Sequence, residues 1–355
     1  MKAMIMAAGV GSRLMPLTMK IPKPMVPMAN RPLMEYILEI LARHGFTGLI
    51  ANLHYHAPVI SGHFGDGSRF GVWLQYSREE ELLGTAGGVK NCQWFLDETF
   101  AVVSGDALTD IDLTRLLEEH RKKGALATIA LKDVEDVEQF GIVVTGEDGR
   151  INQFQEKPRP AEALSHHANT GIYIFEPEIF RYIPTGQFYD FGKQVFPHLV
   201  RIGAPFYGVP IDDYWCDVGN LNTYRQAHRD FLRGELQLTP GGELRECEGN
   251  RVLLAAGSSV ADDVIMEGNV VVGSGCQIES GTRLRDAVLW DQCLVGPHSR
   301  ICEAILGSSC RLGGSVNVNR GTVLASGCFL ANGAETPAGS RVFSTIGGEM
   351  QLEQG

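Results

Sequence analysis

Positively charged side chains follow a glycine-rich turn near the start of the sequence. Residues 9–14 read GVGSRL, and glycines of this kind let backbone N–H groups approach a phosphate closely. Arg13 lies in the turn, and Lys23 follows between two prolines that stiffen the backbone around it. The turn lacks the third glycine of a dinucleotide fingerprint and the Gly-Lys-Ser/Thr of a P-loop. It therefore predicts a phosphate site of another kind, with a charged surface loop as the alternative.

Two aspartates are candidate ligands of a divalent cation. Asp106 follows an apolar run in the sequence VSGD, and Asp217 lies in the sequence WCDVG. A carboxylate at the end of a strand can hold Mg²⁺ beside phosphates. The alternative for Asp106 is a turn or a helix cap, which is how we interpret the nearby Asp110 and Asp112.

Polar residues near two later strands could hold a phosphorylated sugar. Glu156 and Lys157 end a predicted strand and combine an acceptor for hydroxyl groups with a cation for a phosphate. A surface ion pair is the alternative. Asn169 and Thr170 precede the apolar strand predicted at residues 172–175 and offer polar groups at its start.

The segments that must position these residues alternate between strand and helix over the first 230 or so residues. Strands are predicted at residues 3–8, 49–53, 100–104 and 125–131, and helices at residues 30–45, 86–96 and 112–123, the first capped by Asn30. This alternation predicts an α/β fold, a Rossmann-like, mostly parallel sheet with helices on both faces. Ligands of such sheets bind beyond the carboxyl ends of the strands.

An internal repeat follows a Pro- and Gly-containing linker predicted at residues 235–250. Aliphatic or similar residues recur thirteen times from Val260 to Leu330, at six-residue steps except for two five-residue steps at 284–289 and 301–306. A hexapeptide period with a small residue two positions earlier is typical of a parallel β-helix with three short strands per coil. The predicted domains are therefore a catalytic domain at 1–234, the linker, and a left-handed β-helix at 251–355.

Two details of the repeat refine this prediction. The five-residue steps lie three steps apart, which places both on the same face of successive coils. Small cysteines occupy inward positions of the repeat, so we interpret them as core residues and not as ligands or nucleophiles: Cys276, Cys293, Cys310 and Cys328.

Composition narrows the class of protein. The chain has 355 residues and a formal net charge of −11, an acidic balance that argues against nucleic-acid binding. No run of about 18 apolar residues predicts a membrane span, and the short apolar run at 3–8 favours a buried strand over a signal peptide. Eight cysteines without a C-x-x-C pair predict reduced thiols and a cytoplasmic protein.

Six motifs, taken in order, resemble those of the NDP-sugar pyrophosphorylases, the sugar-1-phosphate nucleotidyltransferases. They lie at residues 8–25, 84–88, 104–106, 156–158, 169–171 and 215–219. The resemblance covers about residues 1–233 and is closest to the mannose-1-phosphate guanylyltransferase-like branch, in which a C-terminal left-handed β-helix also occurs. Departures are Ala8, Ser12 and Met15, where the family often has Gly, Thr and Arg.

The resemblance implies a reaction and its participants. A hexose 1-phosphate attacks the α-phosphorus of an NTP in line, giving an NDP-hexose and pyrophosphate, so the expected partners are these two substrates. The attacking oxygen is already ionised, so alignment and charge neutralisation are what the enzyme must supply. GTP with mannose 1-phosphate is the leading pair, and UTP or dTTP with glucose 1-phosphate is the alternative.

Two readings of another kind stay open. One is a catalytically silent regulatory relative. It is disfavoured because all of the charged residues expected of an active enzyme are present: Arg13, Lys23, Asp106, Lys157 and Asp217. Acyl transfer by the β-helix would require a positioned histidine, and His298 has the sequence context of a corner residue. The β-helix is instead expected to cover the catalytic domain or to join subunits in a homo-oligomer.

The resemblance also implies residue roles. Arg13 would hold the leaving pyrophosphate, and Lys23 would lie along the phosphates. The nucleotide would be bound by Ala8, Gly9, Gly11, Ser12, Glu79, Glu80, Gly84, Thr85 and Ala86. The sugar phosphate would be bound by Gly141, Glu156, Lys157, Asn169 and Thr170. Asp106 and Asp217 would hold Mg²⁺ as the cofactor.

The acidic run Glu79–Glu81 bears on the choice of base. Guanine presents N1–H and N2–H₂ donors, which a carboxylate can accept. This favours GTP, and the alternative is a solvated acidic run. The orientation of one hydroxyl that separates mannose from glucose is not readable from the sequence.

Overall fold

A computed structural model describes residues 1–346 and 349–354. It divides the chain into two compact units: a sheet unit of Met1–Val10 and Leu33–Asp217, and a coil unit of Gly11–Pro32 and Val218–Gly355. The chain therefore leaves the sheet unit after Val10 and returns to it at Leu33. The catalytic domain expected at 1–234 includes all of the first unit and two segments of the second.

The sheet unit is built on a nine-stranded sheet with the order β10-β9-β11-β6-β1-β4-β5, in which β8 pairs with β11 and β12. Four neighbouring strands are parallel: β1 (Lys2–Met6), β4 (Gly48–Leu53), β5 (Trp73–Arg78) and β6 (Phe100–Ser104). The remaining strands are β8 (Ala127–Asp133), β9 (Gly141–Thr145), β10 (Ile151–Glu156), β11 (His167–Phe175) and β12 (Phe206–Pro210). Consecutive residues of β1 and β6 are buried, so both faces of the sheet are covered.

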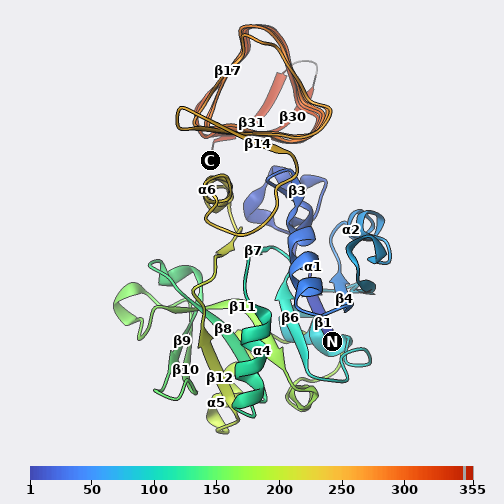
Figure 1. Cartoon of the computed structure of the whole chain (residues 1–355), viewed down its shortest axis with the longest axis vertical. Helices are drawn as coiled ribbons and strands as arrows, with labels where there is room; N and C mark the ends of the chain where they lie inside the picture. Colours follow the sequence, from blue (N-terminus) through green and yellow to red (C-terminus); the bar gives the residue numbers. More distant parts are fainter. Residues whose placement is uncertain (347–348, 355) are drawn as a thin grey trace. The chain divides into compact units, whose positions relative to one another are not determined.

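Helices cover the sheet, as the alternating pattern predicted (Figure 1). They are α1 (Leu33–Arg43), α2 (Ala57–Phe64), α3 (Gly84–Asn91), α4 (Leu113–Lys122) and α5 (Phe196–Arg201). Asp112 caps α4 by accepting a hydrogen bond from the Arg115 N–H at 3.0 Å. An aromatic cluster fills the core between the sheet and the later helices: Phe100, Phe175, Phe191, Phe196 and Phe206.

The start of α1 differs from the prediction. Residues Pro27–Met28 and Arg31–Pro32 form a two-stranded hairpin, β2 and β3, joined by Ala29 and Asn30. Ala29 and Asn30 have φ values of 45° and 66°, the left-handed pair that a two-residue hairpin turn requires. Asn30 is therefore a turn residue and not a helix cap, and α1 begins at Leu33.

The coil unit is a β-helix preceded by a helix and a hairpin. Helix α6 (Leu221–Leu232) begins with a capping box at Asn220. Strand β14 (Glu243–Cys247) pairs antiparallel with β15 (Asn250–Leu254), so part of the segment predicted as a linker is a hairpin. Its sequence lacks a helical period because it is a hairpin, and Glu248 and Gly249 make the turn with φ values of 51° and 81°.

Three ladders of short parallel strands form the sides of the triangular coils visible in Figure 1. One ladder continues from β15 through β18 (Asn269–Val272), β21 (Val288–Leu289), β24 (Ile305–Leu306), β27 (Val323–Leu324) and β30 (Ser340–Ile346), which pairs with β31 (Glu349–Gln354). A second contains β16 (Ser259–Val260), β19 (Gln277–Ile278), β22 (Leu294–Val295), β25 (Arg311–Leu312) and β28 (Phe329–Leu330). The third contains β17 (Ile265–Glu267), β20 (Arg283–Arg285), β23 (Arg300–Cys302), β26 (Asn317–Val318) and β29 (Glu335–Thr336).

These ladders confirm the repeat. Both five-residue steps connect the third ladder to the first, at β20–β21 and β23–β24, so they share one corner. The cysteines of the repeat are buried, and their thiols donate to backbone carbonyls. Examples are Cys276 Sγ to Trp290 O at 3.1 Å and Cys293 Sγ to Gly307 O at 3.2 Å. Helices long and apolar enough for a bilayer are absent from the part of the chain that the structure describes.

Candidate active site

The glycine-rich turn is shaped around Gly11, in the coil unit. Gly11 has a φ of 71° and precedes a short 3₁₀ helix, Ser12–Leu14. Its carbonyl accepts a hydrogen bond from Thr18 Oγ1 at 2.8 Å. A Cβ added at Gly11 would lie 2.8 Å from the Cβ of Lys23, closer than carbon atoms normally approach. The turn and Lys23 therefore pack directly against each other, as a glycine alone allows.

Lys23 is held by its prolines, as the sequence predicted. It starts the 3₁₀ helix Lys23–Met25, with Pro22 before it and Pro24 after it. Its backbone carbonyl accepts from the Val26 N–H at 3.1 Å. The residue is only 6% exposed, whereas Ser12 and Arg13 are exposed.

Helix α6 anchors this segment within the coil unit. The Tyr224 hydroxyl donates to Pro27 O at 2.6 Å and accepts from Trp290 Nε1 at 2.8 Å. His228 Nε2 accepts from the Ala29 N–H at 3.2 Å, while its Nδ1 lies 3.0 Å from Tyr224 O. Burial lowers the pKa of His228 to about 4, so the ring is neutral at pH 7 and can accept this hydrogen bond.

In the sheet unit, a buried polar network connects the carboxyl ends of three parallel strands. Asn52, at the end of β4, accepts from the Ala7 N–H at 2.9 Å and donates to Glu79 Oε1 at 2.7 Å. Glu79 Oε2 accepts from the Leu83 N–H at 3.0 Å. A Cβ added at Gly88 of α3 would lie 2.6 Å from Glu79 Oε1, so the helix packs closely over the carboxylate.

This network gives Glu79 a task other than the expected contact with a base. The residue is only 7% exposed, and each of its oxygens accepts a hydrogen bond from the protein. Glu80 and Glu81 are exposed, so they are the carboxylates of the acidic run that a base could reach. Ala8, which lies two residues beyond the end of β1, is buried, and Gly9 is exposed.

The predicted nucleotide-binding motif at residues 84–88 forms the start of α3 and packs against a segment that no motif indicated. Thr85 Oγ1 donates to Asp190 Oδ2 at 2.9 Å and accepts from the Phe191 N–H at 2.9 Å. Gly84 has a φ of 74°, and a Cβ there would lie 2.6 Å from Tyr189 O. Ala86 is fully buried. The Thr85 hydroxyl therefore connects the start of α3 to Asp190 and Phe191.

Asp106 and Asp217 lie at the ends of two paired strands. Strand β7 (Ala107–Thr109) runs antiparallel to β13 (Trp215–Asp217), with Ala107 opposite Asp217. Asp106 immediately precedes β7, and its Oδ1 accepts from Ser104 Oγ. Both aspartates are partly buried. The pairing thus brings together two carboxylates that lie 111 positions apart in the sequence.

Two carboxylates are enough ligands for Mg²⁺, but too few for a metal that is coordinated by protein side chains alone. Mg²⁺ is usually bound by one or two carboxylates, and phosphates and water complete its coordination. Among the described residues, no group of three or more His, Cys, Asp or Glu side chains could hold a metal ion. Asp110, interpreted from the sequence as a turn residue, accepts from the Tyr214 N–H at 2.8 Å and helps to fix the β7–β13 pair.

Glu156 is the last residue of β10, and Lys157 follows it. Glu156 lies opposite Gly141 in the β9–β10 pair, and both it and Lys157 are exposed. A Cβ at Gly141 or at Gly192 would lie 3.2 Å or 3.1 Å from Glu156 Oε2, so the two glycines leave room beside this carboxylate. Lys157 has a φ of 47°, an uncommon conformation for a side chain of its size.

Asn169 and Thr170 lie within β11 and not before it as predicted, and both side chains form hydrogen bonds with nearby backbone groups. Thr170 is buried, and its hydroxyl donates to Ala130 O at 2.7 Å. Asn169 Oδ1 accepts from the Gly171 N–H at 3.0 Å. Trp215 Nε1 donates to Thr170 O at 3.0 Å. The strand that ends at Asp217 is therefore connected to the predicted sugar segment by a direct hydrogen bond.

Sequence reasoning missed Asn52 and Asp190, which position the site from within the sheet unit. Asn52 could have been found as a polar residue at the carboxyl end of an apolar strand. Asp190 follows no such pattern, since its role depends on the approach of residues 187–191 to α3.

Each of the two parts of the chain matches a known protein family. The family model described as nucleotidyl transferase matches residues 2–234. The model described as GMPPB C-terminal domain matches residues 249–334.

Individual relatives carry different substrate names. A Synechocystis protein named UTP–glucose-1-phosphate uridylyltransferase is 44% identical over 319 residues, which cover 85% of this chain and 80% of the relative. A Mycobacterium tuberculosis protein named mannose-1-phosphate guanylyltransferase is 36% identical over 291 residues, covering 81% and 79%. A solved Bacillus anthracis structure, assigned as a glucose-1-phosphate thymidylyltransferase, has a TM-score of 0.61 at 24% identity and covers 67% of this chain and 97% of that one. This last similarity supports the fold alone.

Proposed function

Because the chain belongs to the nucleotidyl transferase family and is a sugar-1-phosphate nucleotidyltransferase, we propose that it transfers the uridylyl group of UTP to glucose 1-phosphate. The products are UDP-glucose and pyrophosphate. The observation that carries this choice is the 44% identity with the Synechocystis uridylyltransferase. The proposal reverses the preference for guanine expected from the acidic run.

The position of Glu79 supports this reversal. Its carboxylate is buried and already accepts from Asn52 and Leu83, which makes it a poorer acceptor for guanine N1–H and N2–H₂. Uracil presents a single ring N–H donor, so its recognition depends less on a carboxylate. The remaining carboxylates of the run, Glu80 and Glu81, are the ones whose contact with a base requires testing.

In the proposed mechanism, an ionised oxygen of the sugar phosphate attacks the α-phosphorus in line and pyrophosphate leaves. Arg13 holds the leaving pyrophosphate, Lys23 neutralises charge along the phosphates, and Lys157 holds the sugar phosphate. Glu156 accepts hydrogen bonds from sugar hydroxyls in the space beside Gly141. No general base is required, so positioning and electrostatics supply the rate.

Asp106 and Asp217 are the residues that would hold Mg²⁺. When bound, this ion supplies positive charge that stabilises the phosphate oxygens during transfer. The protein's own contribution is the β7–β13 pairing, which fixes the aspartates at neighbouring strand ends. Ser104 further orients Asp106 by donating to its Oδ1.

A second candidate reaction uses GTP and mannose 1-phosphate. It is favoured by the match of residues 249–334 to the GMPPB C-terminal domain and by the M. tuberculosis relative. Every catalytic role given above is the same in this reaction, and only the contacts with the base and the sugar differ.

Pyrophosphate release tests the proposal directly. The purified chain is assayed with Mg²⁺ and each pairing of UTP, GTP, dTTP or ATP with glucose 1-phosphate or mannose 1-phosphate. We expect the highest kcat/KM with UTP and glucose 1-phosphate. The highest value with GTP and mannose 1-phosphate would replace the substrate assignment and keep the catalytic one. No release from folded protein with any pair would contradict both and favour the regulatory alternative.

A further inference from the structure

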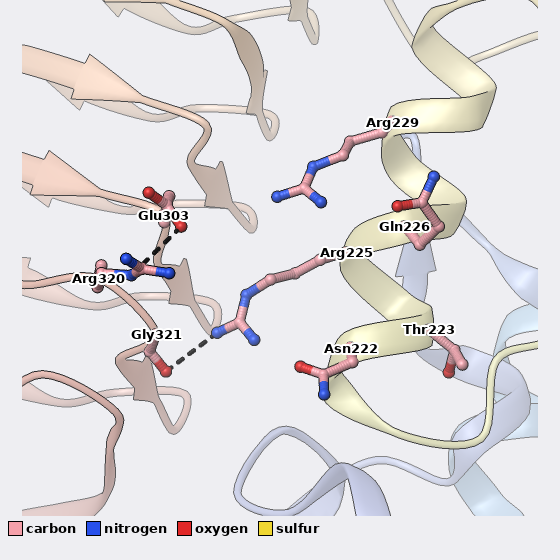
Figure 2. A pocket seen from close by; sticks show the side chains of 8 residues that line it. All are labelled: Asn222, Thr223, Arg225, Gln226, Arg229, Glu303, Arg320 and Gly321. Atoms are coloured by element: carbon pink, nitrogen blue, oxygen red, sulfur yellow. Dashed lines mark hydrogen bonds and ion pairs between the residues drawn. The ribbon is translucent and has the colours of Figure 1, made fainter.

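A cavity rich in arginine lies between α6 and the β-helix, within the coil unit. Its volume is about 480 Å³, and Figure 2 shows the side chains that line it. Helix α6 contributes Asn222, Arg225, Gln226 and Arg229, and the β-helix contributes Glu303 and Arg320. None of these residues has a role in the proposed reaction.

The residues that line the cavity come from one face of α6 and from one corner of the β-helix coils. The residues of α6 lie three or four positions apart, so they share one face of the helix. Glu303 and Arg320 occupy the same corner of successive coils, where the Gly321 N–H donates to Glu303 O at 2.9 Å. Arg225 and Arg229 extend from the helix toward this corner (Figure 2).

Positive charge dominates the cavity. Three guanidinium groups and one carboxylate line it, which gives a net charge of +2. Glu303 pairs with Arg320, whose Nε lies 3.7 Å from Glu303 Oε2. Over the described residues 1–346 and 349–354, Arg225 and Arg229 form no ion pair. Glu303, the one carboxylate of the cavity, also attracts Arg225, but it already pairs with Arg320, so positive charge remains in excess.

Arg225 adds an independent sign of a missing ligand. One of its terminal nitrogens donates to Gly321 O at 3.0 Å, but its Nε is buried without a hydrogen-bond partner among the described residues. A buried donor without an acceptor is costly and uncommon in folded proteins. Burial, and then the charge of Arg229, lowers the pKa of Arg225, and the opposing attraction to Glu303 does not offset this shift.

We propose that this cavity, which is lined by none of the residues assigned to the reaction, binds the phosphate group of a small phosphorylated molecule. Guanidinium groups bind phosphate oxygens through paired, charge-assisted hydrogen bonds, and two of them can converge on one phosphate. The cavity volume is within the range of small-molecule sites. Asn222 and Gln226 supply neutral donors and acceptors for the rest of the ligand. The proposal does not depend on which base or hexose the enzyme uses.

Binding of inorganic phosphate, a hexose 6-phosphate and a nucleoside monophosphate, measured by isothermal titration at constant ionic strength, tests the proposal. The double variant Arg229→Gln/Arg320→Gln removes two of the three cations without touching the reaction centre. The wild type and the double variant have the same catalytic site, so any difference in their phosphate binding comes from the cavity. We expect one binding site fewer, or at least tenfold weaker binding, in the double variant. The ligand arm with the largest difference identifies the source of the phosphate.

Two further variants serve as controls. Arg311→Gln removes an exposed arginine from β25, which belongs to another side of the coils, and should leave binding unchanged. Glu303→Gln removes the one carboxylate that lines the cavity and should tighten binding several-fold, which also keeps the test valid if the double variant does not fold. Equal binding by the wild type and the double variant, or an equal loss in Arg311→Gln, would overturn the proposal, because either result means non-specific attraction to positive charge.

Discussion

Replacing Gly11 with alanine should damage catalysis through Lys23 more than it damages the fold. Alanine at a φ of 71° costs about 1–2 kcal/mol of backbone strain. Its Cβ would also lie 2.8 Å from the Lys23 Cβ, whereas carbon atoms at rest lie about 3.5–4.0 Å apart. Relief of this contact requires a shift of roughly 0.7 Å or more in Lys23 or in the turn.

A shift of this size is expected to lower kcat by about tenfold to a hundredfold, because misplacement of a catalytic group by about 1 Å can cost a hundredfold in rate. The matched control is Gly71→Ala. Gly71 has a φ of 72°, but a Cβ there would meet nothing within 4 Å. Both variants therefore share the backbone strain, and only Gly11→Ala pushes on Lys23.

The assay is pyrophosphate release at saturating substrates, combined with urea unfolding of both variants. Gly11→Ala should lose rate in excess of its loss of stability, while Gly71→Ala should lose stability alone. If Gly11→Ala has the kcat of Gly71→Ala at a similar free energy of unfolding, then contact with Gly11 does not position Lys23 for catalysis, and the argument fails.

Three further predictions concern buried and charged groups. Because burial lowers the pKa of His228 from 6.5 to about 4, neutral His228 contributes about 3 kcal/mol to stability above pH 6.5, and this contribution is lost as the pH falls toward 4. The free energy of unfolding, measured with urea from pH 7 to pH 4, should therefore decrease less in His228→Gln than in the wild type. Glu79→Gln should lower the free energy of unfolding by about 1–3 kcal/mol, because its new amide group must face a hydrogen-bond donor, yet leave the ratio of UTP to GTP turnover unchanged. Asp106→Asn should reduce kcat at least about a hundredfold with an unchanged unfolding midpoint, and near-normal turnover would remove Asp106 from the mechanism.

Much of the fold could be predicted because it depends on local patterns. The hexapeptide period gave the three-sided coil and located both short steps at one corner, since each inward side chain occupies a fixed position in its repeat. The strand at residues 100–104 was predicted with its observed bounds, because a short apolar run bounded by polar residues is a clear signal. Asn30 was misinterpreted because an Asn before a Pro is compatible with a helix cap and with a hairpin turn.

The candidate site was less predictable because its important contacts join distant segments. Motif order identified Asp106 and Asp217 as candidate ligands, but only the β7–β13 pairing shows that they lie at neighbouring strand ends. Glu79 looked like one of three equivalent acidic residues, yet the hydrogen bond from Asn52, 27 positions away, separates it from Glu80 and Glu81. Charge alone in the sequence does not distinguish a buried acceptor from a solvated one.

The β-helix holds the segment that carries Arg13 and Lys23. This segment belongs to the coil unit and is held by it through Asn30 Nδ2, which donates to Val272 O at 3.0 Å, and through the Trp290–Tyr224–Pro27 hydrogen bonds. Like charges such as those of Arg13 and Lys23 repel each other, so a segment that carries both needs other contacts to keep one conformation. The stacked coils supply a rigid support because each strand is hydrogen-bonded to the coils before and after it. The β-helix thus helps to hold the segment on which we propose that the phosphates bind, although it contributes none of the expected catalytic side chains.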